Sequence, residues 1–271
     1  MLAQRLLVII VLIPIGVTFA VLGGWAYAAF IALILVVAAW EYWRIFRRGG
    51  FAPLAGVLLP GVAILALSRA AWGFDHSHLI LSALILVTML AHMGAMAATR
   101  TAQGVDFAIT LGGLLYIGWL GSYLISLRAL PQGLWWLLLV IPIIGIADSA
   151  AFLIGRRFGQ HKLAPTISPN KTWEGYLAGV VFAILSGLLL AWLWRLRYPE
   201  LQLSQGLVLG VMIGVFAPLG DLGESMFKRQ FGVKEASHLL PGHGGVLDRI
   251  DSWIWAAVIG YYLITGLWLT V

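Results

Sequence analysis

Long apolar runs separated by short polar segments dominate the pattern of this chain. Each run approaches the roughly 20 residues that a helix needs to cross the hydrocarbon core of a membrane. About nine such runs occur, near Leu6–Leu22, Trp25–Trp40, Pro53–Ala70, His78–Ala95, Phe107–Leu127, Leu134–Ile154, Gly175–Trp194, Leu203–Phe227 and Ser252–Thr270. The pattern therefore predicts an all-α, polytopic integral membrane helix bundle with about nine transmembrane helices.

Composition favours one continuous membrane domain over residues 1–271. The chain is 61% hydrophobic and 10% charged, whereas a soluble domain has roughly 25% charged residues. Residues 1–130 hold helices to which the sequence assigns no role, and residues 131–271 hold the candidate catalytic helices and motif loops. The first two runs are short and meet at Gly23-Gly24, so a re-entrant hairpin and two tilted helices both fit them.

The basic residues predict the orientation in the membrane. When the N-terminus is placed in the cytoplasm and successive runs alternate sides, most of the 17 Lys and Arg residues fall on the inner side. We therefore expect a multi-pass protein of the inner (plasma) membrane, with the N-terminus and motif loops cytoplasmic. The net charge of +6 suits anionic lipid rather than nucleic acid, because no basic stripe stands on a soluble face. The lack of Cys excludes a thiol nucleophile and a Cys-based zinc site.

Acidic residues concentrate near the C-terminus. Of the 11 acidic residues, five lie between Gly220 and Ser252, namely Asp221, Glu224, Glu235, Asp248 and Asp251. Charge at a membrane boundary is costly unless it is paired or binds an ion or a charged substrate. Asp221, Ser225 and Lys228 follow i, i+4, i+7 spacing and so share one helical face, which Glu224 joins at i+3. An ordinary ion-paired helix surface is the alternative for this face.

A glycine-rich turn precedes the last apolar run. Gly244 and Gly245 allow backbone N–H groups to approach an anion closely. Asp248 follows them, and together with Asp221 it predicts a shared Mg²⁺ site, since Mg²⁺ prefers one or two carboxylates plus substrate phosphates. Asp251 fits either this site or a helix cap paired with Arg249. His243 fits either a phosphate contact or support of the turn.

A third polar segment, Ile167–Gly175, precedes another apolar run. It contains the capping residues Ser168, Asn170 and Thr172 and the mobile cation Lys171, and a helix N-terminus is a natural phosphate site. The alternative is a capped helix whose lysine contacts lipid headgroups.

One acid lies within an apolar run. Asp148 is a functional candidate because an intramembrane carboxylate is costly, although a buried polar contact would also explain it.

These motifs resemble those of the phosphatidate cytidylyltransferase family, also called CDP-diacylglycerol synthases. One stretch of the chain resembles the hallmark motif of that family. It consists of Ser225-x-Phe227-Lys228-Arg229 with Lys234-Glu235, followed by Pro241-x-His243-Gly244-Gly245-Val246-x-Asp248-Arg249-Ile250-Asp251. Two further motifs resemble Ile167–Gly175 and Asp148–Phe152 with Gly155–Gly159. The family pattern has Lys-Asp where this chain has Lys234-Glu235, so the acid is kept but is one methylene longer.

The resemblance implies condensation of CTP with phosphatidic acid at the lipid bilayer, giving CDP-diacylglycerol and pyrophosphate. It implies Mg²⁺ or Mn²⁺ as cofactor, and it leaves a second cation and a homodimer open. The implied catalytic residues are Asp221, Lys228 and Asp248, and the implied metal ligands are Asp221, Asp248, Asp251 and Asp148. The implied substrate-binding residues are Ser168, Asn170, Lys171, Thr172, Ser225, Arg229, Lys234, His243, Gly244, Gly245 and Arg249.

Two other functions fit parts of the pattern. A transporter could use Asp148 and Asp221 as an ion or proton relay, and broken, inverted half-repeats would support it. Another membrane phosphotransferase would need clustered Asp-x-x-Asp pairs, of which Asp248-x-x-Asp251 is the one example here.

The orientation can be tested with single cysteines, because the chain has none of its own. In intact cells, Gln160→Cys is expected to resist an impermeant thiol reagent, because its loop is cytoplasmic. Leu203→Cys is expected to be labelled. The reverse labelling pattern would overturn the predicted orientation.

Overall fold

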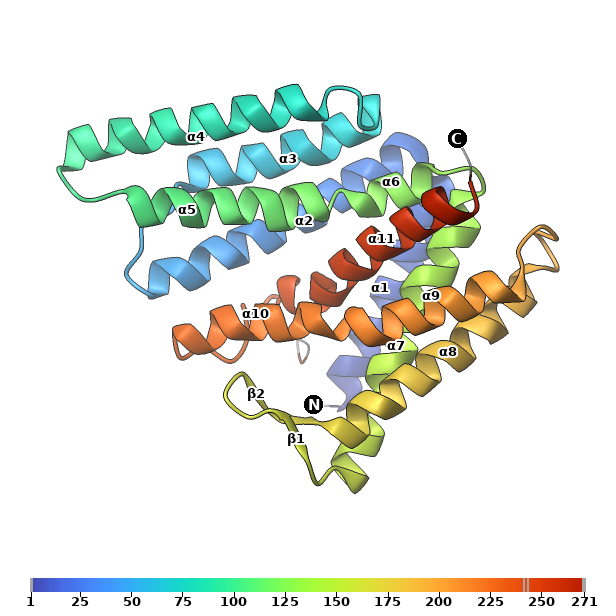
Figure 1. The fold of residues 1–271 in the computed structure, drawn as a ribbon. Helices are drawn as coiled ribbons and strands as arrows, with labels where there is room; N and C mark the ends of the chain where they lie inside the picture. The colour runs from blue at the N-terminus through green and yellow to red at the C-terminus, as the bar shows by residue number, and fades with distance from the viewer. Residues whose placement is uncertain (1, 241, 243, 270–271) are drawn as a thin grey trace. The chain divides into compact units, whose positions relative to one another are not determined.

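The structure is a computed structural model that describes residues 2–240, 242 and 244–269 (Figure 1). Eight of its helical segments are long and apolar enough to cross a membrane, counted over the described residues. A shorter apolar segment, Ile10–Leu22, accounts for the first predicted run. The prediction of an all-α, polytopic membrane protein is confirmed.

The chain divides into two compact units, each built from two stretches of sequence. The first contains Met1–Ala129 and Phe227–Ile250, and the second contains Leu130–Met226 and Asp251–Val271. Most of the hallmark motif therefore folds with the N-terminal helices, and we call this part, Phe227–Ile250, the hallmark segment. The single domain expected from the sequence stays a prediction.

The first unit is a set of helices packed around α2 and α3. Its elements are α1 (Leu2–Leu22), α2 (Gly24–Arg48), α3 (Ala55–Trp72), α4 (Ser77–Thr99), α5 (Gly104–Gly113), the π-helix η1 (Leu114–Leu120) and α6 (Tyr123–Ala129). Figure 1 shows α3, α4 and α5 side by side, and fully buried side chains such as Leu35, Leu58 and Ile117 form the core of the unit. The apolar faces of these helices are thus the main source of packing energy.

Two helix breaks in the first unit coincide with glycine. Gly23 adopts φ of 63° between α1 and α2, so the two short apolar runs are separate helices. The predicted continuous helix Phe107–Leu127 is instead α5, η1 and α6. This stretch is rich in glycine, which weakens a helix interior, and at Gly121 a Cβ atom would lie 2.4 Å from a Leu35 methyl carbon.

The second unit is formed by α7 (Gly133–Phe158), strands β1 (Lys162–Ala164) and β2 (Ser168–Thr172), α8 (Trp173–Trp194), α9 (Leu203–Phe216) and most of α10 (Pro218–Gln230) and α11 (Leu247–Leu267). Helix α8 packs along both α7 and α9 (Figure 1). Small residues bring the backbones close: a Cβ on Gly206 would lie 2.3 Å from the Gly187 carbonyl oxygen. Such contacts are typical of helix pairs in membranes.

Two local features of the second unit differ from expectation. Residues 162–172 form an antiparallel hairpin, with Lys162 opposite Thr172, where a loop and helix cap were expected. The predicted helix Leu203–Phe227 is divided at Ala217 into α9 and α10. Pro218 explains the division, because it lacks a backbone N–H and clashes with the preceding helical turn.

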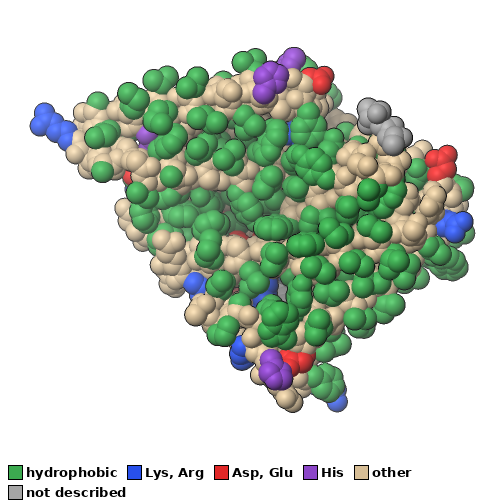
Figure 2. Space-filling view, in the orientation of Figure 1, with side chains coloured by type: hydrophobic (Ala, Val, Ile, Leu, Met, Phe, Trp, Pro, Cys, Tyr) green, Lys and Arg blue, Asp and Glu red, His purple; other side chains and the backbone are tan. Residues whose placement is uncertain are grey.

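Apolar side chains remain exposed along the candidate spans. Figure 2 shows hydrophobic side chains spread over the drawn face, with few charges among them. On α8 they include Leu177, Val181, Leu185 and Trp192. An apolar surface this extensive is unfavourable in water and suits contact with lipid.

The glycine contact between α8 and α9 predicts a stability effect. Gly206→Ala should lower the thermal unfolding temperature of the purified protein, at a cost of about 1–3 kcal/mol, because the new Cβ overlaps Gly187 and forces the helices apart. Gly145→Ala is the control, since no other atom lies within 4 Å of its Cβ position in α7. Equal unfolding temperatures for the two variants would contradict this packing.

Candidate active site

A close contact between α10 and α11 organises the acidic residues of the second unit. A Cβ on Gly220 would lie 2.6 Å from the carbonyl oxygen of Asp251 and 2.7 Å from the Trp255 ring. The hydrogen side chain of Gly220 therefore lets the two backbones approach. The next residue, Asp221, is thereby held beside the first turns of α11.

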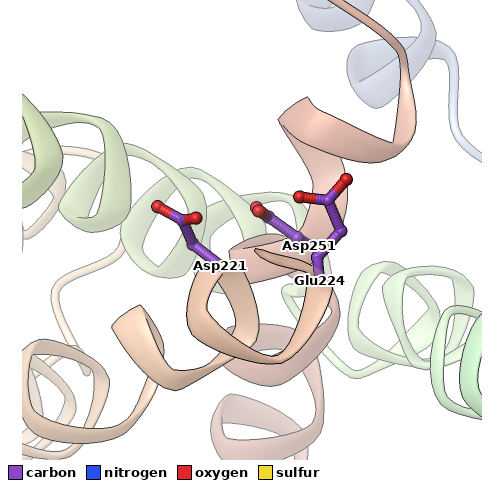
Figure 3. Close-up of side chains that lie close together, drawn as sticks. All are labelled: Asp221, Glu224 and Asp251. Atoms are coloured by element: carbon purple, nitrogen blue, oxygen red, sulfur yellow. The ribbon is translucent and has the colours of Figure 1, made fainter. Parts of the chain in front are cut away.

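Three carboxylates gather where these helices meet. Figure 3 shows Asp221 and Glu224 on α10 together with Asp251 on α11. Each offers one oxygen, and these three oxygens all lie within 4.8 Å of one another. Glu224 and Asp251 are only 1% and 5% exposed. We call these three residues the carboxylate cluster.

Electrostatics make the carboxylate cluster a fit for a divalent cation. Two like charges about 5 Å apart repel by on the order of 3 kcal/mol at an effective dielectric constant of about 20. Buried carboxylates are stable as anions only beside a positive charge or hydrogen-bond donors. A small, hard cation that prefers oxygen ligands meets this requirement, as Mg²⁺ and Mn²⁺ do.

A lysine from the hairpin reaches the edge of the carboxylate cluster. Lys171 Nζ lies 2.9 Å from Asp221 Oδ2, and the Ser225 hydroxyl donates to Asp221 Oδ1 at 3.2 Å. About fifty residues separate Lys171 from Asp221 in sequence, so the fold creates this pair. Lys171 thus supplies positive charge at the edge of the carboxylate cluster.

The hairpin also positions the start of α8. Thr172 is the N-cap of this helix, and its hydroxyl oxygen accepts from the Gly175 N–H at 3.2 Å. Ser168 and Asn170 lie on β2 instead of capping the helix. Their predicted role in substrate binding stays a prediction.

Asp248 lies in the first unit, in a different environment. Its Oδ1 accepts from Lys228 Nζ at 2.5 Å, and its Oδ2 accepts from the N–H groups of Ala236 and Gly245 at 2.9 and 2.8 Å. The Lys228 and Asp248 side chains are 8% and 7% exposed. Gly244 adopts φ of +79° beside this carboxylate. Asp248 thus organises the turn that precedes α11, and its role as a ligand of a metal shared with Asp221 stays a prediction.

The remaining predicted site residues lie in several places. Lys234 and Arg249 are exposed, as is Arg229, which donates to the Val233 carbonyl oxygen at 3.2 Å. Asp148 is exposed on α7 and does not belong to the carboxylate cluster. His243 lies outside the described residues.

Two buried acids with a place in the clusters above or in the hallmark region were not predicted as site residues. Glu224 was placed on the same face as Asp221 but was not predicted as a ligand. Glu41 lies in α2 and is fully buried. Its sequence signal is an acid directly after the apolar run Trp25–Trp40, whereas Asp148 lies within such a run.

The fold and these clusters define a membrane-embedded helical protein with acidic and basic groups suited to phosphate chemistry. Comparison with known proteins identifies the family. A family described as "Cytidylyltransferase family" matches residues 3–267. The chain belongs to the cytidylyltransferase family, and it is a nucleotidyltransferase.

Curated relatives support this assignment over nearly the whole chain. A phosphatidate cytidylyltransferase of Synechocystis sp. is 33% identical, covering 96% of this chain and 96% of the relative. The protein of that name from Pseudomonas aeruginosa is 34% identical over 93% of each chain. That of Bacillus subtilis is 37% identical over 71% of this chain and 69% of the relative. The family resemblance found in the motifs is confirmed.

The carboxylate cluster predicts a metal-binding effect. Glu224→Gln should raise the Mg²⁺ concentration needed for half-maximal nucleotidyl transfer about tenfold or more, because one of three charged oxygen donors is lost. Glu200→Gln is the control, since Glu200 is exposed between α8 and α9. Identical Mg²⁺ dependence in Glu224→Gln and the wild type would remove Glu224 from the site.

Proposed function

We propose that this protein is a CTP:phosphatidate cytidylyltransferase, which condenses CTP with phosphatidic acid to CDP-diacylglycerol and pyrophosphate in phospholipid synthesis. Membership of the cytidylyltransferase family and the names of the relatives support the reaction. The structural observation that carries the proposal is the carboxylate cluster with Lys171 at its edge. Family membership also favours an enzyme over the transporter considered from the sequence.

The proposed chemistry asks for positioning and charge neutralisation. A phosphate oxygen of phosphatidic acid attacks the α-phosphorus of CTP, and the bond to the pyrophosphate oxygen breaks. The lipid phosphate is already anionic at neutral pH, so a strong general base is not required. Transfers at phosphorus depend mainly on alignment and on stabilising charge on the phosphate oxygens.

The cation of this reaction is proposed to be Mg²⁺ or Mn²⁺, held by Asp221, Glu224 and Asp251. When bound, it neutralises charge on the triphosphate and the leaving pyrophosphate. Asp148 and Asp248 are retained as further candidate ligands, and a second cation is left open. Lys171 orients Asp221 and supplies positive charge beside the phosphates.

The segment Phe227–Ile250 is proposed to contribute further phosphate contacts. Lys228, with Asp248 as its partner, is proposed to act in catalysis. The other proposed substrate-binding residues are Ser168, Asn170, Thr172, Ser225, Arg229, Lys234, His243, Gly244, Gly245 and Arg249. Most Lys and Arg residues fall on the predicted inner side, which supports an inner-membrane protein whose motif loops face the cytoplasm. CTP is available on that side. A homodimer is left open.

The proposed reaction can be measured directly. Purified protein is mixed with CTP labelled at the α-phosphate, phosphatidic acid and Mg²⁺, and label is followed into extracted lipid. We expect labelled CDP-diacylglycerol and an equal amount of pyrophosphate, both abolished by a chelator and restored by Mg²⁺. Labelled lipid formed only when phosphatidic acid is replaced by another lipid phosphate would overturn the proposed substrate.

Lys171 predicts a second kinetic effect. Lys171→Ala should lower kcat/KM for CTP or phosphatidic acid about tenfold to a hundredfold, because a charge-assisted contact contributes roughly 1.5–3 kcal/mol. Lys171→Arg should retain part of the activity, since charge survives while the geometry changes. Lys162→Ala, on the exposed part of the same hairpin, is the control. Normal kinetics for both substrates in Lys171→Ala would show that this lysine only anchors the hairpin.

A further inference from the structure

A buried acid of the N-terminal half contacts the hallmark segment. Glu41 lies in α2 and is fully buried. Its Oε1 accepts from the Ser237 hydroxyl at 2.5 Å and from the Val246 N–H at 3.0 Å. Its Oε2 accepts from the Leu247 N–H at 2.6 Å. These partners lie about 200 residues further along the chain, and all belong to the first compact unit.

Glu41 caps the last apolar helix, α11, although it is distant from that helix in sequence. Leu247 is the first residue of α11, and the N–H groups of a first helical turn have no partner within their own helix. A carboxylate is favoured there because it accepts these hydrogen bonds and complements the positive end of the helix dipole. The start of α11 is therefore fixed by a side chain from α2.

Glycine makes this contact possible. A Cβ on Gly245 would lie 2.6 Å from both carboxylate oxygens of Glu41. The same glycine donates its N–H to Asp248 Oδ2 at 2.8 Å. One short turn is thus held between two carboxylates, one from α2 and one from α11.

Aromatic packing holds the other end of the segment on α2. The Phe46 ring lies 5.7 Å from that of Phe227 and 5.2 Å from that of Phe231, measured between ring centroids. Tyr42 contacts Phe227 edge-on at 5.8 Å. The end of α10 and the start of α11 are therefore both attached to one helix, through apolar contacts at one end and Glu41 at the other.

We infer that Glu41 is a positioning residue for nucleotidyl transfer, which it serves by fixing the segment that carries Lys228, Gly245 and Asp248. This inference rests on the proposed function of that segment. It assigns a role to the N-terminal helices beyond membrane anchoring. Glu41 contacts the backbone and Ser237, so its effect on the reaction passes through the residues that it holds.

The change Glu41→Gln tests this role. An amide keeps the size of the side chain but replaces one acceptor oxygen with a donor, which then faces one of the N–H groups that Glu41 accepts. We expect kcat for CDP-diacylglycerol formation to fall about tenfold to a hundredfold, with a much smaller change in KM, because misplaced groups act mainly on the transition state. Rates are expressed per folded protein.

Asp106→Asn is the matched control. Asp106 is also a buried acid of the first unit, and its Oδ1 accepts one backbone N–H, that of Ala52, at 2.7 Å. A loss of stability without a positioning role should affect both variants alike. We expect kcat of Asp106→Asn to stay within about threefold of the wild type. Asp106 binds Ala52 and does not contact the segment that Glu41 holds, so its loss should not displace that segment.

Hydrogen exchange provides a readout that does not depend on activity. In Glu41→Gln, peptides covering residues 236–247 should exchange faster, while peptides from α7 and α8 keep wild-type rates. If Glu41→Gln does not fold, Ser237→Ala decides, because it removes one of the three contacts: kcat should then fall about threefold to tenfold, with faster exchange in the same peptides.

The results separate the role of Glu41 from the proposed reaction. Wild-type kcat and wild-type exchange in Glu41→Gln, or in Ser237→Ala if the first variant does not fold, would overturn the role of Glu41. A fall in kcat matched by Asp106→Asn would also overturn it. A wild-type protein that forms no CDP-diacylglycerol would overturn the proposed function instead, and hydrogen exchange would still report whether Glu41 holds the segment.

Discussion

Charge buried inside a protein must be compensated, and this constraint explains how the polar groups of this protein are arranged. Glu41 is compensated by backbone N–H groups and a hydroxyl, and Asp248 by Lys228 and two N–H groups. The carboxylate cluster gathers three carboxylates, one of which pairs with Lys171. The divalent cation proposed for this cluster would satisfy the same constraint and supply what transfer at phosphorus requires.

Close contacts at two glycines bring the charged groups and their partners together. Gly220 allows α10 to approach α11 in the second unit, and Gly245 allows Glu41 to reach the turn before α11 in the first. A methyl group at either position would overlap the partner atoms. Gly245, which the sequence placed in a turn suited to an anion, therefore also lets a side chain approach the backbone. Helix α2 takes part in this arrangement, so the N-terminal half is more than a membrane anchor.

The sequence predicted the features that depend on local pattern. Apolar runs of spanning length gave the all-α membrane fold, and the motifs gave the family. Contacts between distant segments left no local pattern, so Glu41 was missed and Lys171 could not be paired with Asp221 in advance. Glu224 was not predicted as a member of the carboxylate cluster, because the pattern of one helical face cannot show that Asp251 of another helix lies nearby. The division of Leu203–Phe227 was foreseeable, since Pro218 interrupts it.

The location of a bound cation would show directly whether the carboxylate cluster binds the metal of the reaction. Crystals of the protein grown in lipid with Mn²⁺ would reveal the ion by its anomalous scattering. We expect one peak within about 2.5 Å of oxygens from Asp221, Glu224 and Asp251, and we expect this peak to be lost in Glu224→Gln. A Mn²⁺ peak coordinated without any of these three carboxylates, with the cluster neutralised by other groups, would contradict it.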